Sequence, residues 1–155
     1  MTSWIRLAGD SKKRSQSTGF GVEVKCYCAV RRTNDTDMAR ILIIDDSAFQ
    51  RRIVRGMLTP EGHEVVEATD GAEGVALAKE GFDLVLVDLI MPEMDGFAVL
   101  EVLHRELPGL PTATLTADIQ EATKRQCLAL GARAFLNKPP QRSTLLSLVQ
   151  ELSGR

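Results

Sequence analysis

The chain has 155 residues, of which 44% are hydrophobic, and its formal net charge is −2. This length suits one domain with a sizeable core and is too short for two ordinary domains. The small net charge gives no overall case for nucleic-acid binding, and no apolar run approaches the roughly 20 residues of a membrane-spanning helix. The three cysteines follow no disulfide framework spacing, which favours reduced thiols and a cytoplasmic protein.

Residues 1–38 show no sustained helical or strand periodicity and are expected to form an N-terminal extension. Met38 stands directly before the first predicted strand, so this extension is either disordered or lies upstream of the true start codon. Its Cys26 and Cys28 could indicate a metal site, but no further Cys or His lies nearby to complete four ligands. We therefore expect the folded domain to span residues 39–155.

From residue 40 onward, short apolar runs alternate with segments of helical spacing. The first helix is expected to start at an N-cap, Ser47, with Phe49 in its apolar stripe. The fourth helix is expected to be capped by Asp118, and the last to contain Pro140 in its first turn. The predicted strands are residues 40–44, 63–68, 84–87, 112–116 and 134–136.

Alternating strands and helices predict βαβ units in one mostly parallel sheet, a doubly wound α/β fold. Right-handed crossovers bring the carboxyl ends of all the strands to one edge of that sheet. The side chains at this edge would be Asp45, Asp46, Asp88, Thr116 and Lys138. Open α/β sheets bind their ligands at this edge.

Three carboxylates at one edge repel one another, so either one is protonated or a cation lies between them. Oxygen ligands without His or Cys suit Mg²⁺, or Mn²⁺, rather than zinc. Lys138 could then hold a phosphate oxygen and Thr116 could donate a hydrogen bond to it, while a carboxylate could accept the phosphoryl group. The alternatives are structural: Asp88 or Thr116 caps the following helix, and Lys138 pairs with one aspartate.

Four motifs in this order resemble the receiver domain of two-component response regulators. They are D-D-S at residues 45–47, D-x-x-M-P-x-M-D-G at 88–96, T-A-D at 116–118 and K-P at 138–139. The resemblance covers residues 39–153 and is that of a stand-alone, CheY-like receiver. It implies a flavodoxin-like sheet of five parallel strands in the order 2-1-3-4-5, with five helices.

The resemblance also implies a role for each residue at the sheet edge. Asp88 would be the phosphorylation site, forming an aspartyl phosphate. Thr116 and Lys138 would contact the phosphoryl group, and the peptide before Pro139 would be cis. Phe135, which replaces a frequent Tyr, would change rotamer when Thr116 moves. The implied Mg²⁺ ligands are Asp45, Asp46, Asp88 and the backbone carbonyl of Ile90.

Two positions are expected to tune the lifetime of the phosphorylated state. Ile90, two residues after Asp88, and Asp118, two after Thr116, should flank the approach of water to the aspartyl phosphate. Ile90 is apolar and stiff, so we expect it to shield the site and slow self-dephosphorylation. Pro140 stands where such domains commonly carry Phe, which could alter the signalling face.

The resemblance implies a phosphoacceptor switch rather than an enzyme. Its partners would be a sensor histidine kinase or a histidine phosphotransfer protein and a downstream target protein, with no nucleic acid and no membrane. Its binding face would comprise residues 118–130, 133–137 and the last helix, after which too few residues follow for an output domain.

Other classes of protein fit the sequence less well. A phosphohydrolase with an aspartate nucleophile needs a second acid at the position where this chain has Ile90. A flavodoxin-like cofactor binder would want a phosphate loop after the first strand. A phosphorylation-independent binding module of the same fold remains the alternative.

Overall fold

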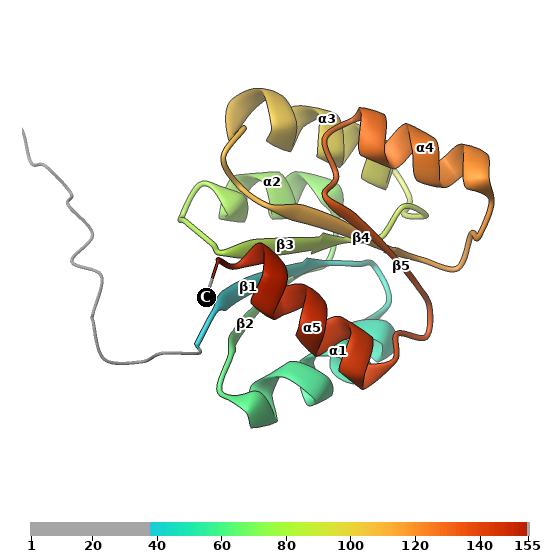
Figure 1. The fold of residues 1–155 in the computed structure, drawn as a ribbon. Helices are drawn as coiled ribbons and strands as arrows, with labels where there is room; N and C mark the ends of the chain where they lie inside the picture. Colours follow the sequence, from blue (N-terminus) through green and yellow to red (C-terminus); the bar gives the residue numbers. More distant parts are fainter. Residues whose placement is uncertain (1–37, 155) are drawn as a thin grey trace, which may run out of the picture. The chain divides into compact units, whose positions relative to one another are not determined.

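The computed structural model describes residues 38–154, in which five strands alternate with five α-helices (Figure 1). The predicted extension, with Cys26 and Cys28, lies outside the described residues apart from Met38. The strands are β1 (Arg40–Ile44), β2 (Glu64–Ala68), β3 (Leu84–Val87), β4 (Thr112–Thr116) and β5 (Ala134–Asn137). The helices are α1 (Ala48–Leu58), the 3-10 helix η1 (Thr59–Glu61), α2 (Gly71–Ala78), α3 (Gly96–Glu106), α4 (Glu121–Ala129) and α5 (Arg142–Leu152).

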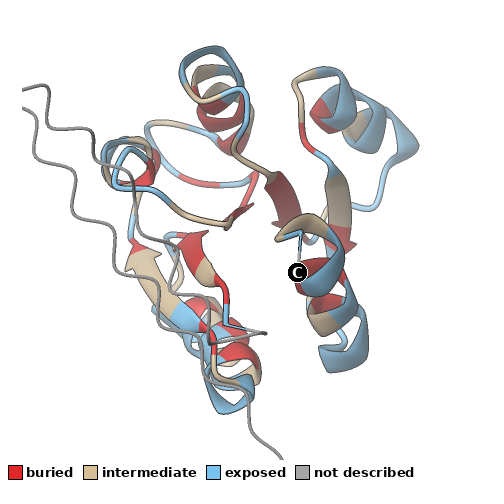
Figure 2. Cartoon of the chain, turned by 60° about the vertical axis from the view of Figure 1, so that its left-hand side comes forward, coloured by how far each residue is buried: buried red, intermediate tan, exposed pale blue. Residues whose placement is uncertain are grey.

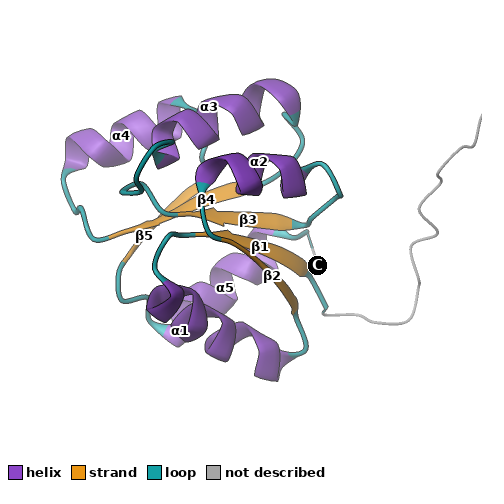
Figure 3. Cartoon of the chain, turned by 180° about the vertical axis from the view of Figure 1, so that it is seen from behind, coloured by secondary structure: helices purple, strands orange, loops and turns teal. Residues whose placement is uncertain are grey.

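The strands form one sheet in the order β2-β1-β3-β4-β5, and every neighbouring pair is parallel. This confirms the predicted flavodoxin-like topology. Helices α2, α3 and α4 cover one face of the sheet, and α1 and α5 cover the other (Figures 1 and 3). The carboxyl ends of all five strands therefore share one edge, as the right-handed βαβ connection requires.

A hydrophobic core lies on each face of the sheet, and successive strand residues alternate between the two cores. In β1, Ile41 and Ile43 pack toward α1 and α5, whereas Leu42 and Ile44 pack toward α2 and α3. Every residue of β3 and β4 is buried, as expected for central strands covered on both faces (Figure 2). The continuous apolar runs of the sequence are explained by this double coverage.

Two helices begin later than the sequence predicts. Helix α4 starts at Glu121 with Gln120 as its N-cap residue, so Asp118 lies two residues before the cap position. Helix α5 starts at Arg142 with Gln141 as its N-cap residue, so Pro140 precedes the helix and is buried there. Asp118 still binds the start of α4 through its side chain, because its two oxygens accept from Gln120 N and from the Thr123 hydroxyl.

The buried face of α1 contains Val54 and Leu58 as predicted but differs from the prediction at its start. Its buried residues are Arg51, Val54 and Leu58, whereas Phe49 is 69% exposed. Phe49 and Arg51 are two residues apart, about 200° around a helix, so they face opposite directions. An arginine thus occupies the buried row where an aromatic side chain was expected.

None of the helices described between residues 38 and 154 is long and apolar enough to span a membrane. Both hydrophobic cores are built from residues between Ala39 and Leu152.

We expect a chain consisting of residues 38–155 to fold without the preceding segment, because the described residues already form a hydrophobic core on each face of the sheet. Its melting temperature should match that of the full chain within about 2 °C, the shift that a few tenths of a kcal/mol produce. Thermal unfolding of both chains followed by circular dichroism measures this. A larger drop on truncation would show that residues 1–37 pack on the domain.

Candidate functional site

The candidate site lies at the carboxyl edge of the sheet, where β1 and β3 both end in an aspartate. The backbone ladder continues one residue past each strand: Asp88 N donates to Ile44 O at 2.9 Å, and Asp45 N donates to Ala68 O at 3.2 Å. One carboxylate oxygen from each of Asp45, Asp46 and Asp88 lies within 4.8 Å of the others. Asp45 and Asp88 are buried, and Asp46 is exposed. The predicted cluster of three acids is therefore present.

Lys138 bridges the two buried acids. Its Nζ lies 2.6 Å from Asp45 Oδ2 and 2.9 Å from Asp88 Oδ2. The backbone N–H of Lys138 donates to Thr116 O at 2.8 Å, which ties the lysine to the end of β4, and the Lys138–Pro139 peptide is cis as expected. Burial lowers the pKa of Lys138, but its bonds to Asp45 and Asp88 outweigh burial and raise it. The lysine is thus a stable cation that contacts two acids rather than one.

Asp88 is under opposing influences. Burial raises the pKa of its carboxyl above the ordinary value, the bond and charge of Lys138 lower it, and the nearby charge of Asp45 raises it again. The net direction of the pKa is upward, because burial first and the charge of Asp45 second outweigh the effect of Lys138. An added cation would relieve the remaining repulsion.

The donor set fits a hard cation. All three clustered side chains offer carboxylate oxygens, the ligands that Mg²⁺ prefers, and the exposed Asp46 opens the cluster to solvent. Ile90 N donates a long hydrogen bond of 3.4 Å to Asp88 Oδ1, which folds the segment after β3 back toward the site. The part played by the Ile90 carbonyl stays a prediction.

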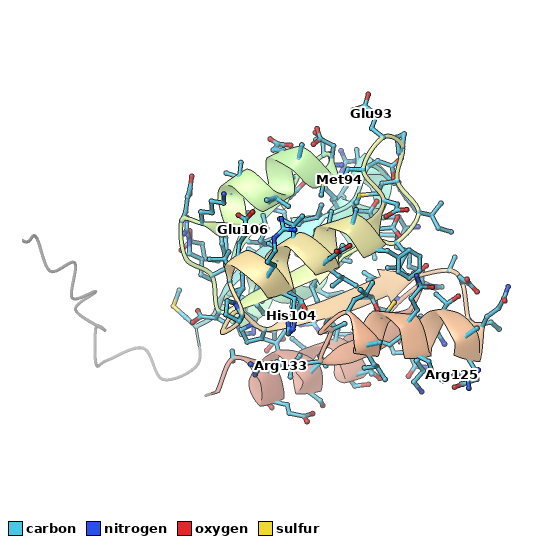
Figure 4. All side chains as sticks on the ribbon, turned by 90° about the horizontal axis from the view of Figure 1, so that it is seen from above. Glu93, Met94, His104, Glu106, Arg125 and Arg133 are labelled. Atoms are coloured by element: carbon cyan, nitrogen blue, oxygen red, sulfur yellow. The ribbon has the colours of Figure 1, made fainter. Side chains whose placement is uncertain are left out.

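Gly96 holds the segment between β3 and α3 against the site. Its N–H donates to Leu89 O at 3.1 Å, and a Cβ on Gly96 would lie 2.6 Å from Leu89 Cα and in conflict with Asp88 O. Only glycine permits so close an approach of helix to strand end. Glu93, in the segment between β3 and α3, adopts a positive φ of 67°, and its side chain projects away from the protein (Figure 4).

Thr116 lies at the end of β4 and is fully buried. Its Oγ1 accepts a hydrogen bond from Asp118 N at 3.2 Å, but the N-cap residue of α4 is Gln120, so the alternative that Thr116 caps this helix is wrong. The Asp118 carboxylate accepts from the Thr123 hydroxyl at 2.7 Å and from Gln120 N at 2.9 Å. These bonds lower the pKa of Asp118 and connect Thr116 to the first turn of α4.

Phe135 lies on β5 and is half-buried against the core on the side of α2, α3 and α4. The strand register pairs it with Thr114, two residues before Thr116 on the same face of β4. Thr116 and Phe135 therefore belong to neighbouring strands and to one face of the sheet. Helix α4 covers that face with a single buried side chain, Cys127.

Sequence reasoning missed one residue beside the acid pair, Arg51. Arg51 had been assigned no role, but its Nη1 donates to the carbonyl oxygen of Asp45 at 2.7 Å. No local signal marks such an arginine, because its acidic partner, Glu67, lies on another strand.

The sheet order and the acid–lysine cluster define a doubly wound domain with a lysine and three acids at the carboxyl edge of its sheet. The family model of the response regulator receiver domain matches residues 41–150, and the chain belongs to this family. Receiver domains are signalling switches of two-component systems rather than conventional enzymes, and they typically bind Mg²⁺ through acidic residues.

The chain is similar in sequence to several proteins of known role. Protein PilH of Pseudomonas aeruginosa is 40% identical over 115 residues, which cover 72% of this chain and 95% of PilH. The chemotaxis protein CheY of Thermotoga maritima is 34% identical, over 74% of this chain and 97% of CheY. The crystal structure of CheY4 from Vibrio cholerae has a TM-score of 0.70 and 34% identity, and covers 74% of this chain and 98% of CheY4.

Proposed function

We propose that this chain is a single-domain response regulator that accepts a phosphoryl group on Asp88. The observation that carries this proposal is the position of Asp88: it ends the central strand β3, is buried, and lies 2.9 Å from Lys138 inside the acid cluster. The donor would be a phosphohistidine of a sensor kinase or of a histidine phosphotransfer protein. The similarity covers 95% of PilH and 97% of CheY, which supports a receiver of their kind.

The chemistry is a displacement at phosphorus. An Asp88 carboxylate oxygen attacks the phosphorus atom, a P–O bond forms, the P–N bond to the imidazole breaks, and the histidine leaves. Asp45, Asp46, Asp88 and the Ile90 carbonyl would hold Mg²⁺, which supplies positive charge opposite the phosphoryl oxygens. Lys138 holds one phosphoryl oxygen as a point charge, and the Thr116 hydroxyl donates a hydrogen bond to another.

Signalling follows from the contacts of Thr116. When its hydroxyl turns toward the phosphoryl group, the bond from Asp118 N is strained or lost. Asp118 carries that movement to α4 through Gln120 and Thr123, and the Phe135 ring refills the space beside Thr116. The result is a population shift of the face formed by α4, β5 and α5, which would bind a downstream protein in the cytoplasm.

The alternative function is a binding module of the same fold that works without phosphorylation. Titrating the purified protein with acetyl phosphate and Mg²⁺ separates the two. We expect a mass increase of one phosphoryl group together with changed amide exchange in α4, β5 and α5. No incorporation in the presence of Mg²⁺, or exchange changes confined to α1 and α2, would contradict the proposal.

The phosphoryl group is expected to be long-lived, because Ile90 shields it. Ile90 is 66% exposed beside Asp88 and cannot hydrogen-bond an attacking water, while both oxygens of Asp118 are engaged at the start of α4. Ile90→Asn supplies room and a polar partner, and one hydrogen bond of about 1 kcal/mol should accelerate decay about fivefold. Decay of the phosphorylated protein, free of donor and with Mg²⁺ present, measures this.

The matched control is Ile119→Asn, because Ile119 is equally exposed at 71% but follows β4 rather than β3. Its decay should match that of the wild-type protein. If Ile90→Asn decays no faster than wild type, the shielding residue lies elsewhere, and Asp118 becomes the better candidate.

A further inference from the structure

Arg51 is a buried cation in the row of α1 residues that faces the sheet. Only 9% of the residue is exposed, and it lies one turn before the apolar Val54 in that row. A buried charge destabilises a protein unless it is paired and hydrogen-bonded. The contacts of Arg51 should therefore explain why it replaces an apolar residue at this position.

The guanidinium of Arg51 joins two strands. Its Nη1 donates to the carbonyl oxygen of Asp45 at 2.7 Å, and its Nε donates to Glu67 Oε2 on β2 at 2.9 Å. Burial raises the pKa of Glu67, but the hydrogen bonds and charges of Arg51 and Arg55 outweigh it and lower the pKa. Glu67 therefore stays ionised and holds the guanidinium against the turn that follows β1.

That turn carries the acid pair. Asp45 is held by Arg51 at its carbonyl oxygen, by Ala68 O at its N–H, and by Ser47 N at its Oδ1, 2.8 Å away. The Asp45 carbonyl belongs to the peptide that leads to Asp46, so the bond from Arg51 sets the orientation of that peptide. Both carboxylates then face Asp88 before any cation binds.

We propose that Arg51 is a positioning residue of the metal site, which it preorganises by holding the peptide between Asp45 and Asp46. This inference rests on the proposed function, because it assigns the acid cluster to Mg²⁺. Groups that orient metal ligands typically change metal affinity 10–100-fold when they are replaced. We expect Arg51→Gln to weaken Mg²⁺ binding about tenfold.

The chain supplies a matched control in Arg55, one helical turn later. Its Nη1 pairs with the other oxygen of Glu67 at 3.1 Å, and its side chain is 58% exposed. Arg55→Gln thus removes a positive charge and a Glu67 contact but leaves the bond between Arg51 and Asp45 in place. We expect this variant to bind Mg²⁺ within about twofold of wild type, since exposed ion pairs contribute little.

Calorimetric titration of the unphosphorylated full chain with Mg²⁺ alone tests the proposal. A second readout is the Mg²⁺ concentration for half-maximal phosphorylation by acetyl phosphate. For Arg51→Gln this concentration should rise about tenfold, while the rate at saturating Mg²⁺ stays within about twofold of wild type. A variant with purely structural damage would lose rate at saturation as well.

The outcomes separate this inference from the proposed function. Unchanged Mg²⁺ affinity in Arg51→Gln, or an equal loss in Arg55→Gln, overturns the positioning role of Arg51. Absence of Mg²⁺ binding by the wild-type protein overturns the metal site itself. If Arg51→Gln does not fold, Glu67→Gln tests the proposal instead, because it removes the ion pair that holds the guanidinium against Asp45 O. This variant should weaken Mg²⁺ binding by less than the loss of about tenfold expected for Arg51→Gln. Unchanged affinity would overturn the proposal.

Discussion

Asp88→Asn is expected to abolish phosphate incorporation from acetyl phosphate. Asparagine has nearly the shape of aspartate, but its amide is not a nucleophile and offers one acceptor oxygen in place of two. Of the three clustered acids, Asp88 alone follows the central strand β3, whereas Asp45 and Asp46 follow β1, so we expect neither of them to replace it. Mass spectrometry of the intact protein after incubation with acetyl phosphate and Mg²⁺ measures the incorporation.

The control variant is Asp95→Asn in the same loop. Asp95 caps α3 by accepting from Ala98 N at 2.9 Å, and asparagine is an equally good N-cap residue. Incorporation should therefore be retained. Undiminished labelling of Asp88→Asn would show that another residue accepts the phosphoryl group.

Asp88→Asn should also be more stable than wild type in the absence of Mg²⁺. The pKa of Asp88 is raised on folding, so the folded state binds a proton at a pH where the unfolded chain has lost it. Stability therefore falls as the pH rises through this range, and the ionised side chain destabilises the fold at neutral pH. Removing the charge should raise the free energy of unfolding, and Mg²⁺ should stabilise wild type more than the variant.

Gly96→Ala is expected to have the largest structural effect among single methyl additions in this domain. The new Cβ would lie 2.6 Å from Leu89 Cα and in conflict with Asp88 O, so α3 must move away from the end of β3. Overpacking against backbone typically costs up to about 3 kcal/mol. Urea denaturation should show this loss, and phosphorylation should slow markedly, because Asp88 is displaced from Lys138.

Gly56→Ala is the control for Gly96→Ala, because the same methyl group is added where there is room for it. Gly56 lies inside α1, and a Cβ there meets nothing within 4 Å. Alanine favours the helix, so this variant should be more stable by about 0.5–1 kcal/mol, with unchanged phosphorylation. If Gly96→Ala were as stable as wild type, the close packing of α3 on Asp88 would not be what requires glycine.

The strands were predictable because their pattern is local. The bounds of β1, β3 and β4 match the predicted runs. In β1 and β3 the signal is a continuous apolar segment that is followed directly by Asp. The start of α4 was not predictable to the residue. Asp118 has the side chain of a cap, but its oxygens bind Gln120 N and Thr123 rather than the N–H groups that follow a cap position.

The buried residue in the first turns of α1 could not be predicted either. Counting apolar residues placed Phe49 in the buried row, whereas Arg51 occupies it. The arginine is tolerated there because Asp45 O and Glu67 compensate its burial, and Glu67 reaches it only through the pairing of β1 with β2. Hydrophobicity alone cannot indicate a buried cation whose partner lies on another element.

The sequence by itself determined the parallel sheet and the edge at which Asp45, Asp46, Asp88, Thr116 and Lys138 meet. Alternation of strands and helices allows only right-handed crossovers, and these bring every strand end to one side. The tertiary structure alone decided that Lys138 bridges Asp45 and Asp88, and that Arg51 holds the turn between the paired acids. Such contacts depend on how far side chains from distant segments reach into a shared space, and no local pattern records those distances.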